Sequence, residues 1–419
     1  MLQEWQYAKS EVTVKTLDNG GSVLPKPLVG ITVLEVGHVL SGPFCTMLLA
    51  DLGAKVIKIE RPVQGDEARQ LGPQVQGDSS YFMSVNRGKQ SITINLSSKE
   101  GQNLARGLSQ HVDVFVENFV PGTMKRLGLD YSCLKPLNPR LVYASISGFG
   151  QDGPYAHYPA LDIIVQAMGG IMSVTGEPNG RPLRPGASLG DSIAGLFTAL
   201  AIEAALLERE RTKEGRYVDI SMLDCQVTIM ENALARYFAT GQVPKPLGSR
   251  HPAAVPFQAF ATLDSYIVVA IIIDNPRLWN RFCTAILHPE LADDKRFNTA
   301  TARLQNYETL APIMENAIRQ KTSREWLEEF SKLEIPCGPV NKIDAVVNDP
   351  QILHRGMIAE IPHKRLGKWN VAKTPFNFAE ASEPLGPAPD LGEHTEQVLQ
   401  QILGLSQTEI TRLKKLGVV

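Results

Sequence analysis

Residues 31–60, ITVLEVGHVLSGPFCTMLLADLGAKVIKIE, decide the fold of this chain. Two short runs in this stretch, ITVLEV (31–36) and KVIKIE (55–60), are rich in β-branched apolar residues and predict buried strands. The segment GPFCTMLLADLGA between them predicts a helix that ends at Gly53. A strand, a helix and a second strand in this order form the β-α-β unit that opens a parallel sheet.

Three further runs predict more strands: SITINL (91–96), DVFVEN (113–118) and LVYASIS (141–147). Helical or Pro/Gly-punctuated segments separate them. Because strands alternate with helices through about residue 220, we expect the α/β class. The clearest helix is expected from Asp191 to about Arg211, where apolar residues recur at helical spacing and Gly215 follows as a stop.

The chain changes character beyond about residue 230. PFQAFATLDSYIVVAIII (256–273) predicts a β-hairpin, and the segments TLAPIMENAIRQ and SREWLEEFSKL predict amphipathic helices. We therefore expect a smaller second domain over about 228–335. The Pro-rich stretch EPLGPAPDLG (383–392) is expected to link it to a final helix.

Composition narrows the classes of function. The 419 residues are 43% hydrophobic and 21% charged, as in ordinary globular proteins, and the net charge of -2 shows no basic face for nucleic acid. No run approaches the ~18 consecutive apolar residues of a membrane helix. Five scattered cysteines argue against a disulfide framework and a zinc site. We expect a cytoplasmic protein that acts on small molecules, binding neither nucleic acid, membrane nor metal.

The glycines of SISGFGQDGP (145–154) have the spacing G-x-G-x-x-G of a dinucleotide-binding loop. That loop must lie directly between a strand and a helix, with an acidic residue ~20 positions further on. Here Tyr, His and Pro follow Gly153 and delay any helix. The alternative is a glycine-rich turn where the backbone lies close to another group, and we favour it.

A second motif, GASLG (186–190), matches the G-x-S-x-G elbow of serine hydrolases, with Ser188 as the nucleophile. An elbow follows a buried strand, yet GRPLRP just upstream contains two prolines and two arginines. A thioesterase with Ser188 and His394 therefore stays open as a minor alternative.

Several stretches together resemble the family III CoA transferases, the group that includes formyl-CoA:oxalate and carnitine CoA transferases. In the first half these are HVLSGPFCTMLLADLGAKVIKIERP, YFMSVNRGKQSITINL, VFVENFVPGTMKRLGL, SISGFGQDGP, DIIVQAMGG and GASLGDSIAG. VPFQAF, IPCGPVN and PAPDLGEHT extend the match almost to the C-terminus. Only the first 25 or so residues fall outside it.

The resemblance implies an open, Rossmann-like large domain built from both ends of the chain, with a small domain inserted between them. The expected parts are a polar arm (1–24), the first part of a CoA-binding domain (25–227), an α+β small domain (228–335), and a linker with a C-terminal return to the large domain (336–419). The resemblance also implies an obligate homodimer of two interlocked chains. No cofactor is expected to be bound permanently, because the coenzyme A thioester is a substrate.

Asp191 has two interpretations. From the residues alone it predicts an N-cap, because an aspartate directly before a strong helix accepts hydrogen bonds from first-turn amides. By resemblance, Asp191 matches the family's catalytic aspartate, which attacks the acyl-CoA thioester and carries CoA as an aspartyl thioester. The two roles are compatible, because a helix N-terminus favours a negative charge and the ionised carboxylate is the nucleophile.

The resemblance also implies binding residues. The arginines suit the phosphates of an ADP group and Phe119 suits a wall for adenine or pantetheine, although ordinary surface and core roles remain the alternatives. A small-domain loop, PLGSRHPAAVPF, is expected to cover the site, with a glycine for flexibility and basic residues for a substrate carboxylate. Asp162 is expected to lie near the thiol end of CoA, or simply to cap a helix. The expected CoA contacts are His38, Val39, Ser41, Arg61, Asn118, Phe119, Arg126, Leu127 and Asp162, and the expected substrate-loop residues are Gly248, Arg250 and His251.

The same fold includes α-methylacyl-CoA racemases, which place a histidine just before the residue matching Asp162. This chain has Leu161 there, and leucine cannot exchange a proton, so a racemase is disfavoured. The sequence is similar to members that use dicarboxylates such as succinate, glutarate, malate, citramalate or mesaconate. We therefore expect CoA transfer from a dicarboxylyl-CoA such as succinyl-CoA to a free carboxylic or dicarboxylic acid.

Overall fold

The structure is a computed structural model that describes residues 15–16, 22–272, 274–378 and 385–419. Most of the predicted polar arm, and part of the predicted linker, lie outside these residues. The chain divides into two compact units. The large unit takes its residues from within Met1–Ile171, Pro185–Leu234 and His354–Val419, and the small unit consists of Met172–Arg184 and Ala235–Leu353. The domain limits expected at residues 228 and 335 stay a prediction.

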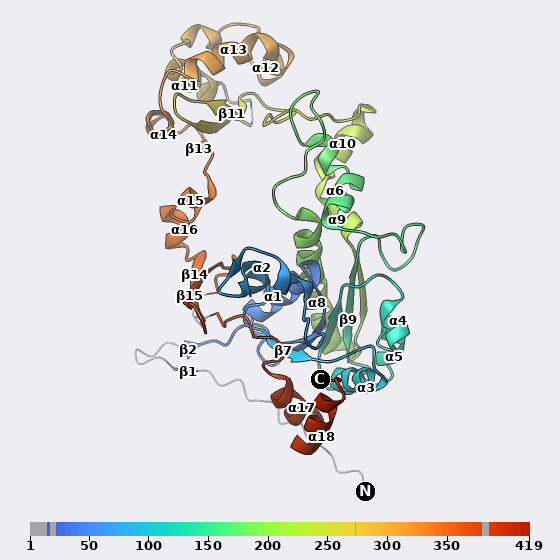
Figure 1. Cartoon of the computed structure of the whole chain (residues 1–419). Helices are drawn as coiled ribbons and strands as arrows, with labels where there is room; N and C mark the ends of the chain where they lie inside the picture. The colour runs from blue at the N-terminus through green and yellow to red at the C-terminus, as the bar shows by residue number, and fades with distance from the viewer. Residues whose placement is uncertain (1–14, 17–21, 273, 379–384) are drawn as a thin grey trace. The chain divides into compact units, whose positions relative to one another are not determined.

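A six-stranded parallel sheet forms the centre of the large unit (Figure 1). Its strands lie in the order β10-β9-β8-β3-β4-β7. The chain builds β3, β4 and β7 in one direction and then returns to the other side of β3 for β8, so the strand order reverses between β3 and β8. Open sheets of this type bind ligands at the carboxyl ends of the strands beside such a reversal. The strands are β3 (Thr32–Val36), β4 (Lys55–Glu60), β7 (Gln90–Thr93), β8 (Val114–Glu117), β9 (Val142–Ser147) and β10 (Tyr217–Ser221).

This arrangement confirms the predicted α/β class and the strands of the opening unit. The four central strands, β9, β8, β3 and β4, are buried on both faces, so their residues are mostly apolar, as expected of a parallel sheet covered by helices. Val33 faces one core cluster and the next residue, Leu34, faces the other. Helices α1 (Ser41–Asp51) and α8 (Leu189–Thr212) cover the first face. On the second face lie α3 (Lys99–Ser109), α4 (Thr123–Leu127), α5 (Tyr131–Leu134) and the C-terminal α17 (Thr395–Leu403).

Helix α8 corrects the N-cap interpretation of Asp191. The helix begins at Leu189, with Ser188 at the N-cap position, so Asp191 is the third helical residue and lies inside the first turn. The prediction of an N-cap at Asp191 was therefore wrong. The helix ends at Thr212, one residue beyond the predicted end, and Lys213 follows in the left-handed conformation.

By length and composition, α8 is also apolar enough to cross a membrane, although charged residues interrupt its apolar sequence. However, 44% of its most apolar window is buried inside the structure. Ala194, Ala199 and Ile202 contribute to the core beneath the sheet. We therefore interpret α8 as a core helix.

Several short elements complete the large unit. The predicted final helix is in fact two, α17 and α18, separated by Gly404 in the left-handed conformation. Its remaining helices are η1 (Glu67–Gln70), α2 (Ser80–Val85), α6 (Asp162–Met168), α9 (Met222–Ile229) and α18 (Gln407–Lys415). Three pairs of short strands also belong to it: β1 (Lys15–Thr16) with β2 (Ser22–Val23), β5 (Gln74–Val75) with β6 (Asp78–Ser79), and β14 (Ile358–His363) with β15 (Gly367–Ala372). Helices α7 (Ile171–Val174), α10 (Glu231–Thr240) and α16 (Pro350–His354) lie where the two units divide.

The small unit contains a three-stranded antiparallel sheet. Strands β11 (Phe257–Ala261) and β12 (Tyr266–Ala270) form the predicted hairpin, and β13 (Cys337–Pro339) pairs with β12. The two predicted amphipathic helices are α13 (Tyr307–Ile318) and α14 (Ser323–Lys332). Large aromatic side chains such as Trp279 and Trp326 fill the core of the small unit. The remaining helices are α11 (Pro276–Ala285), η2 (Pro289–Ala292), α12 (Ala300–Gln305) and α15 (Ile343–Val346).

Candidate active site

The expected CoA contacts after β3 and β8 lie side by side. The amide nitrogen of His38 donates to Asn118 Oδ1 at 2.9 Å, and Asn118 Nδ2 donates to His38 O at 2.9 Å and to Ser41 Oγ at 3.0 Å. His38 follows β3, Ser41 begins α1 and Asn118 follows β8. These three residues therefore meet where the strand order reverses, the place at which an open parallel sheet binds ligands.

Aromatic and charged contacts extend this group. The rings of His38 and Phe119 stack with their centroids 4.9 Å apart. His38 Nδ1 lies 3.3 Å from a Glu67 carboxylate oxygen, and Arg61, which follows β4, pairs with the same carboxylate. The structure thus joins predicted residues from the ends of three neighbouring strands, while Glu67 was not predicted from the sequence.

Val39 occupies a strained position in the same loop. Its φ angle is 60°, which is uncommon for a β-branched residue, and its amide donates to Asp66 Oδ1 at 2.9 Å. Its N–H is thus already used within the protein.

Arg126 and Leu127 lie on α4, which begins six residues after β8 ends. Arg126 is exposed, and its guanidinium donates to Thr123 Oγ1 at 3.2 Å. Leu127 is half-buried and packs against the core on the second face of the sheet. Of the two, Arg126 alone has a side chain suited to a phosphate.

Asp191 is half-buried in the first turn of α8, and a second carboxylate binds this end of the helix. Asp162 Oδ1 accepts hydrogen bonds from the backbone N–H of Gly190 at 2.9 Å and from that of Asp191 at 3.4 Å. Asp162 is the first residue of α6, so α6 supplies a capping carboxylate to α8. Asp162 therefore positions the backbone that carries Asp191.

Gly190 permits this close approach. A Cβ atom at Gly190 would lie 2.7 Å from Val165 Cγ2 and 3.0 Å from Asp162 Oδ1, so any side chain would separate α6 from α8. The other oxygen of the cap is also used, because Asp162 Oδ2 accepts from Gln166 Nε2 at 2.7 Å. Gln166 is fully buried.

Tyr81, on α2, is a site residue that the sequence did not reveal. Burial, together with the negative charges of Asp191, Asp162 and Asp66, raises its pKa to about 12. Its phenol, like that of an ordinary tyrosine, is protonated at neutral pH and can donate a hydrogen bond. Tyr81 is the first residue of the family stretch YFMSVNRGKQSITINL, but nothing in that stretch indicates the two aspartates, and only the folded chain brings it within their electrostatic reach.

The predicted substrate loop belongs to the small unit, and its basic residues contact aromatic rings there. The Arg250 guanidinium lies over the Tyr307 ring, 3.9 Å from its centroid, and the ring of His251 lies 4.8 Å from that of Phe257. Gly248 has a φ angle of 63°, and its amide donates to the carbonyl oxygen of residue 176 at 2.9 Å. The left-handed conformation accounts for glycine at position 248.

The glycine-rich motif at 148–153 is a turn after β9. A Cβ at Gly148 would lie 2.0 Å from Ala160 Cβ, and Gly150 and Gly153 both have positive φ angles. The next large-unit helix, α6, begins only at Asp162. The motif therefore lacks the strand-turn-helix geometry of a dinucleotide loop.

The hydrolase alternative finds little support in the contacts of its two residues. Ser188 occupies the N-cap position of α8, and no strand precedes it within 171–188. His394 Nδ1 accepts a hydrogen bond from Ser91 N at 3.3 Å, which ties the C-terminal segment to β7.

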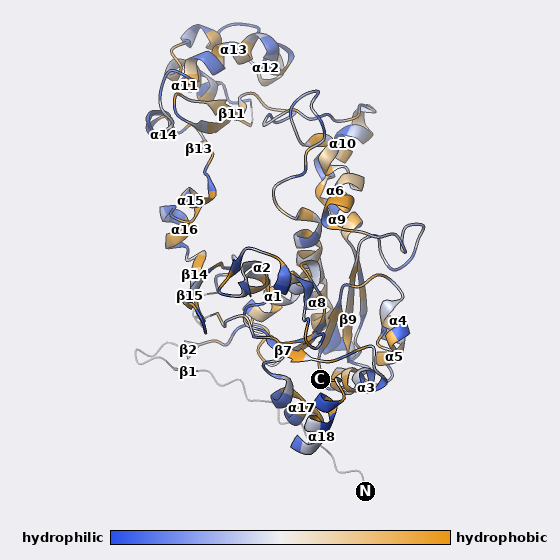
Figure 2. Cartoon of the chain, viewed as in Figure 1, coloured by the Kyte–Doolittle hydropathy of each residue, from blue (hydrophilic) through white to orange (hydrophobic). Residues whose placement is uncertain are grey.

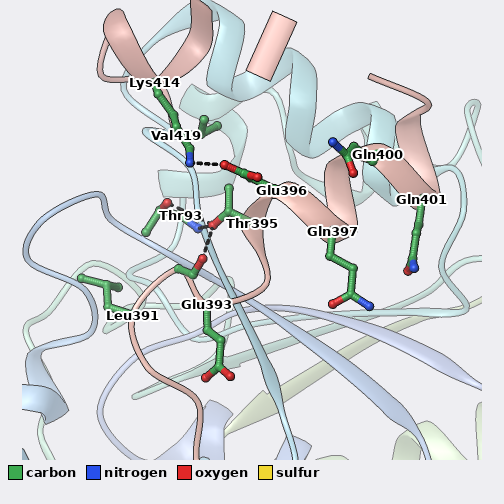
Figure 3. A pocket seen from close by; sticks show the side chains of 11 residues that line it. Thr93, Leu391, Glu393, Thr395, Glu396, Gln397, Gln400, Gln401, Lys414 and Val419 are labelled. Atoms are coloured by element: carbon green, nitrogen blue, oxygen red, sulfur yellow. Dashed lines mark hydrogen bonds and ion pairs between the residues drawn. The ribbon is translucent and has the colours of Figure 1, made fainter. Parts of the chain in front are cut away.

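A cavity of about 760 Å³ beside α17 and α18 is lined by other residues (Figure 3). Thr93, Thr395, Glu396 and Lys414 are among them, and Lys414 pairs with Glu396. This cavity contains none of the predicted site residues, and we assign it no role in the chemistry.

Comparisons with known proteins agree with the motifs. Residues 28–395 match the model of CoA-transferase family III. The succinyl-CoA:glutarate CoA-transferase of Mus musculus is 38% identical over 400 residues, which cover 94% of this chain and 90% of that protein. The acetyl-CoA:oxalate CoA-transferase of Acetobacter aceti is 44% identical over 333 residues, covering 79% of this chain and 85% of that protein.

Solved structures give the same answer for the fold. A CAIB/BAIF family protein from Brucella suis superposes with a TM-score of 0.81 at 37% identity, covering 90% of this chain and 100% of the other. Sequence and fold thus agree along nearly the whole chain: it belongs to CoA-transferase family III and is an enzyme of that family.

Proposed function

We propose that this enzyme moves coenzyme A from a dicarboxylyl-CoA, such as succinyl-CoA, to a free carboxylic or dicarboxylic acid, with Asp191 as the nucleophile. The observation that carries the proposal is the half-buried Asp191 carboxylate in the first turn of α8, beside the Asp162 cap. The similarity to a succinyl-CoA:glutarate CoA-transferase supports the choice of dicarboxylates.

The proposed reaction has two symmetrical halves. A carboxylate oxygen of Asp191 attacks the donor thioester carbonyl. The C–S bond breaks, which releases CoA thiolate and forms a mixed anhydride between Asp191 and the donor acyl group. The thiolate then attacks the Asp191 carboxyl carbon and expels the donor acid, which forms an aspartyl-CoA thioester. The acceptor carboxylate attacks this thioester to form a second anhydride and release the thiolate, which finally attacks the acceptor acyl carbon and frees Asp191.

The surrounding residues have distinct proposed roles. The first-turn amides of α8 favour negative charge near Asp191, and Asp162 holds that turn in place through Gly190 N. The Tyr81 hydroxyl can donate a hydrogen bond to the oxygen on which charge develops during attack. Water must be excluded while the anhydride exists, and the loop containing Gly248 is the proposed cover.

Coenzyme A is proposed to lie along the carboxyl ends of β3, β4 and β8. Asn118 and Phe119 would contact its pantetheine or adenine, with His38, Val39 and Ser41 forming the wall after β3. Arg61 and Arg126, both exposed, would pair with its phosphates. Arg250 and His251 would bind the free carboxylate of a dicarboxylic substrate.

We also propose a homodimer, in the cytoplasm. Leu196, Leu200 and Leu207 are all at least half exposed along α8, and Figure 2 shows further hydrophobic residues on α6. Apolar surface of this kind is typical of an interface. The interlocked arrangement expected from the family is the proposed form of that interface, and the five free cysteines suit a reducing compartment.

An isotope experiment tests the mechanism. In the proposed scheme one acceptor oxygen passes to Asp191 and then, in the next turnover, to the released donor acid. An acceptor labelled with oxygen-18 in its carboxylate should therefore transfer label to the released donor acid. A panel of donor acyl-CoAs and acceptor acids identifies the substrates to use. Hydroxylamine should react with the aspartyl-CoA thioester and convert Asp191 to a hydroxamate, which mass spectrometry of the peptide detects. Full activity in Asp191→Asn would exclude the mechanism.

The same experiments separate the alternatives. A thioesterase would place oxygen from labelled water into the acid and would lose activity in Ser188→Ala but keep it in Asp191→Asn. A racemase would exchange the α-proton of a chiral acyl-CoA for deuterium without any acceptor acid. Leu161, 72% exposed, offers no group for that exchange.

A further inference from the structure

Four charged side chains lie buried beneath the loop that joins β3 to α1. Glu35, Lys58, Asp66 and Lys89 are each at most 4% exposed, and we call them the buried charge cluster. Glu35 and Lys58 are direct partners in the pairing of β3 with β4, near the carboxyl ends of both strands. Two carboxylates and two ammonium groups balance in charge, as buried ions require.

Lys58 makes two hydrogen bonds and one further ion pair. Its Nζ atom lies 2.7 Å from Glu35 Oε1, 2.8 Å from Asp66 Oδ2 and 2.8 Å from the carbonyl oxygen of Gly37. Although burial alone would lower the pKa of Lys58, Glu35 and Asp66 raise it above its ordinary value. The ammonium group therefore stays charged and holds Gly37 O.

Lys89 is bound in the same way on the other side of Glu35. Its Nζ atom lies 2.9 Å from each of Glu35 Oε2, Asn86 Oδ1 and the carbonyl oxygen of Pro43 in the first turn of α1. Asp66 completes the cluster, because its Oδ1 accepts from Val39 N at 2.9 Å and from Ala68 N at 2.8 Å.

The cluster thus binds the loop at three backbone points. Lys58 holds Gly37 O, Asp66 holds Val39 N, and Lys89 holds Pro43 O. Val39 has a left-handed backbone that a β-branched residue adopts only when its surroundings enforce it. His38 lies between the first and second of these points and Ser41 between the second and third, so the cluster fixes the backbone on both sides of each.

We propose that the buried charge cluster positions the β3–α1 loop for coenzyme A, with Lys58 as its central positioning residue. None of the four side chains is exposed to a ligand, so they act through His38 and Ser41. This inference rests on the proposed function, because it takes these two residues as CoA contacts. Preorganised contacts reduce the cost of ordering the loop when the ligand binds.

The test compares Lys58→Met with a matched control, Arg87→Met. Arg87 is another buried cation, paired with Asp51 at 2.6 Å at the far end of α1, so its loss also removes a buried ion pair. Both variants should have a lower Tm. Only Lys58→Met should weaken binding of free CoA in calorimetry by about tenfold and raise the KM for the donor acyl-CoA similarly. The kcat at saturating donor should stay within about threefold, because the first turn of α8 is intact.

A milder pair keeps the test decisive if Lys58→Met does not fold. Asp66→Asn keeps the shape of its side chain but removes the charge opposite Lys58, and Asp51→Asn does the same opposite Arg87. Asp66→Asn should weaken CoA binding about threefold more than Asp51→Asn. Hydrogen exchange of peptides covering 37–43 should also speed up in Asp66→Asn, while exchange in β9 stays unchanged.

The outcomes are distinguishable. If the wild-type enzyme neither binds CoA nor transfers it, the proposed function fails and this inference fails with it. If the wild type binds CoA, and the Lys58 or Asp66 variants bind it as tightly as their controls, only the positioning role is overturned. A loss of kcat without a change in CoA affinity would also overturn it.

Discussion

The carboxyl end of β3 and the first turn of α8 are held in place in different ways. The loop after β3 is bound at three backbone points by Lys58, Asp66 and Lys89, and the fourth member of the buried charge cluster, Glu35, binds both lysines. In the turn that carries Asp191, one oxygen of Asp162 accepts from the Gly190 amide, and the absence of a side chain at Gly190 permits this close approach. The network around the β3–α1 loop should tolerate the loss of a single hydrogen bond. The α8 turn should instead shift when the capping oxygen is removed or when a methyl group is added at Gly190.

The largest effect in this comparison is expected for Asp162→Ala. It leaves Gly190 N without the oxygen that caps α8 and permits the Asp191 backbone to shift. Loss of a cap costs ~1 kcal/mol of stability, and a displacement of about 1 Å at a nucleophile can lower kcat by about 100-fold. Steady-state kinetics should show this fall in kcat.

Two controls accompany that measurement. Asp162→Asn keeps an oxygen that can cap the helix and should recover most of the kcat. Ser98→Ala removes the N-cap of α3, which accepts from Gly101 N, and should lower the Tm without altering kcat. An Asp162→Ala enzyme with wild-type kcat would contradict the role given to this carboxylate.

Gly190→Ala should have the next largest effect. The new methyl group would lie 2.7 Å from Val165 Cγ2, closer than carbon atoms approach, so α6 and α8 must separate. We expect a loss of about 1–3 kcal/mol in the free energy of unfolding and a lower kcat. Gly186→Ala is the matched control, because a methyl group there meets nothing within 4 Å. Equal Tm values for the two variants would contradict the close approach of the helices.

A pH-dependent effect is expected at Glu117, the last residue of β8. Burial raises the pKa of its carboxyl group from 4.5 to about 7. Between these values the folded state binds more protons than the unfolded state, so the stability present below pH 4.5 is lost as the pH rises through 7. Glu117→Gln stays neutral, and it should be more stable than the wild type at pH 8 by up to about 3 kcal/mol.

Denaturant unfolding at several pH values measures this difference. At pH 4.5 the free energies of unfolding of the two proteins should be close, and the gap should open between about pH 5 and 8. A gap that does not vary with pH would show that Glu117 does not titrate in this range. Since Glu117 accepts from Phe119 N at 2.8 Å, the result also reports on the turn proposed to contact CoA.

The smallest effect is expected for Thr46→Val, which tests the redundancy of the buried charge cluster. Thr46 Oγ1 donates to Glu35 Oε2 at 2.6 Å, but that carboxylate keeps both lysines. We expect a loss of about 1 kcal/mol in stability and a KM for acyl-CoA within about twofold of the wild-type value. A tenfold rise in KM would mean that the network depends on each single bond, as the α8 turn does.

The opening β-α-β unit could be predicted from the sequence because its signals are local. A run of β-branched residues, a helical repeat and the left-handed Gly53 each act within a few residues of one another. The family stretches along the chain, with the motif around Asp191 among them, likewise identified the family before any contact was known. The same local reasoning placed the start of α8 too late, because its cap is Asp162, 28 positions before Gly190 in the chain.

Other parts of the candidate site had weaker signals. Glu35 is the one charged residue of β3, and Lys58 lies in the interior of β4, whose two end residues are also charged. A strand buried on both faces rarely carries a charge in its interior without a partner. That pattern could have suggested a buried pair. Tyr81 had no comparable signal, because nothing in YFMSVN indicates two aspartates from α6 and α8.

The sequence by itself determined the α/β class, the main strands and helices, and the family, since these follow from periodicity and from motifs read along the chain. The tertiary structure alone decided which carboxylate caps α8, which tyrosine lies near Asp191, and which four charges lie together beneath the β3–α1 loop. Such contacts join residues from different strands and helices. Their geometry depends on how the sheet and its covering helices pack, and no local pattern specifies it.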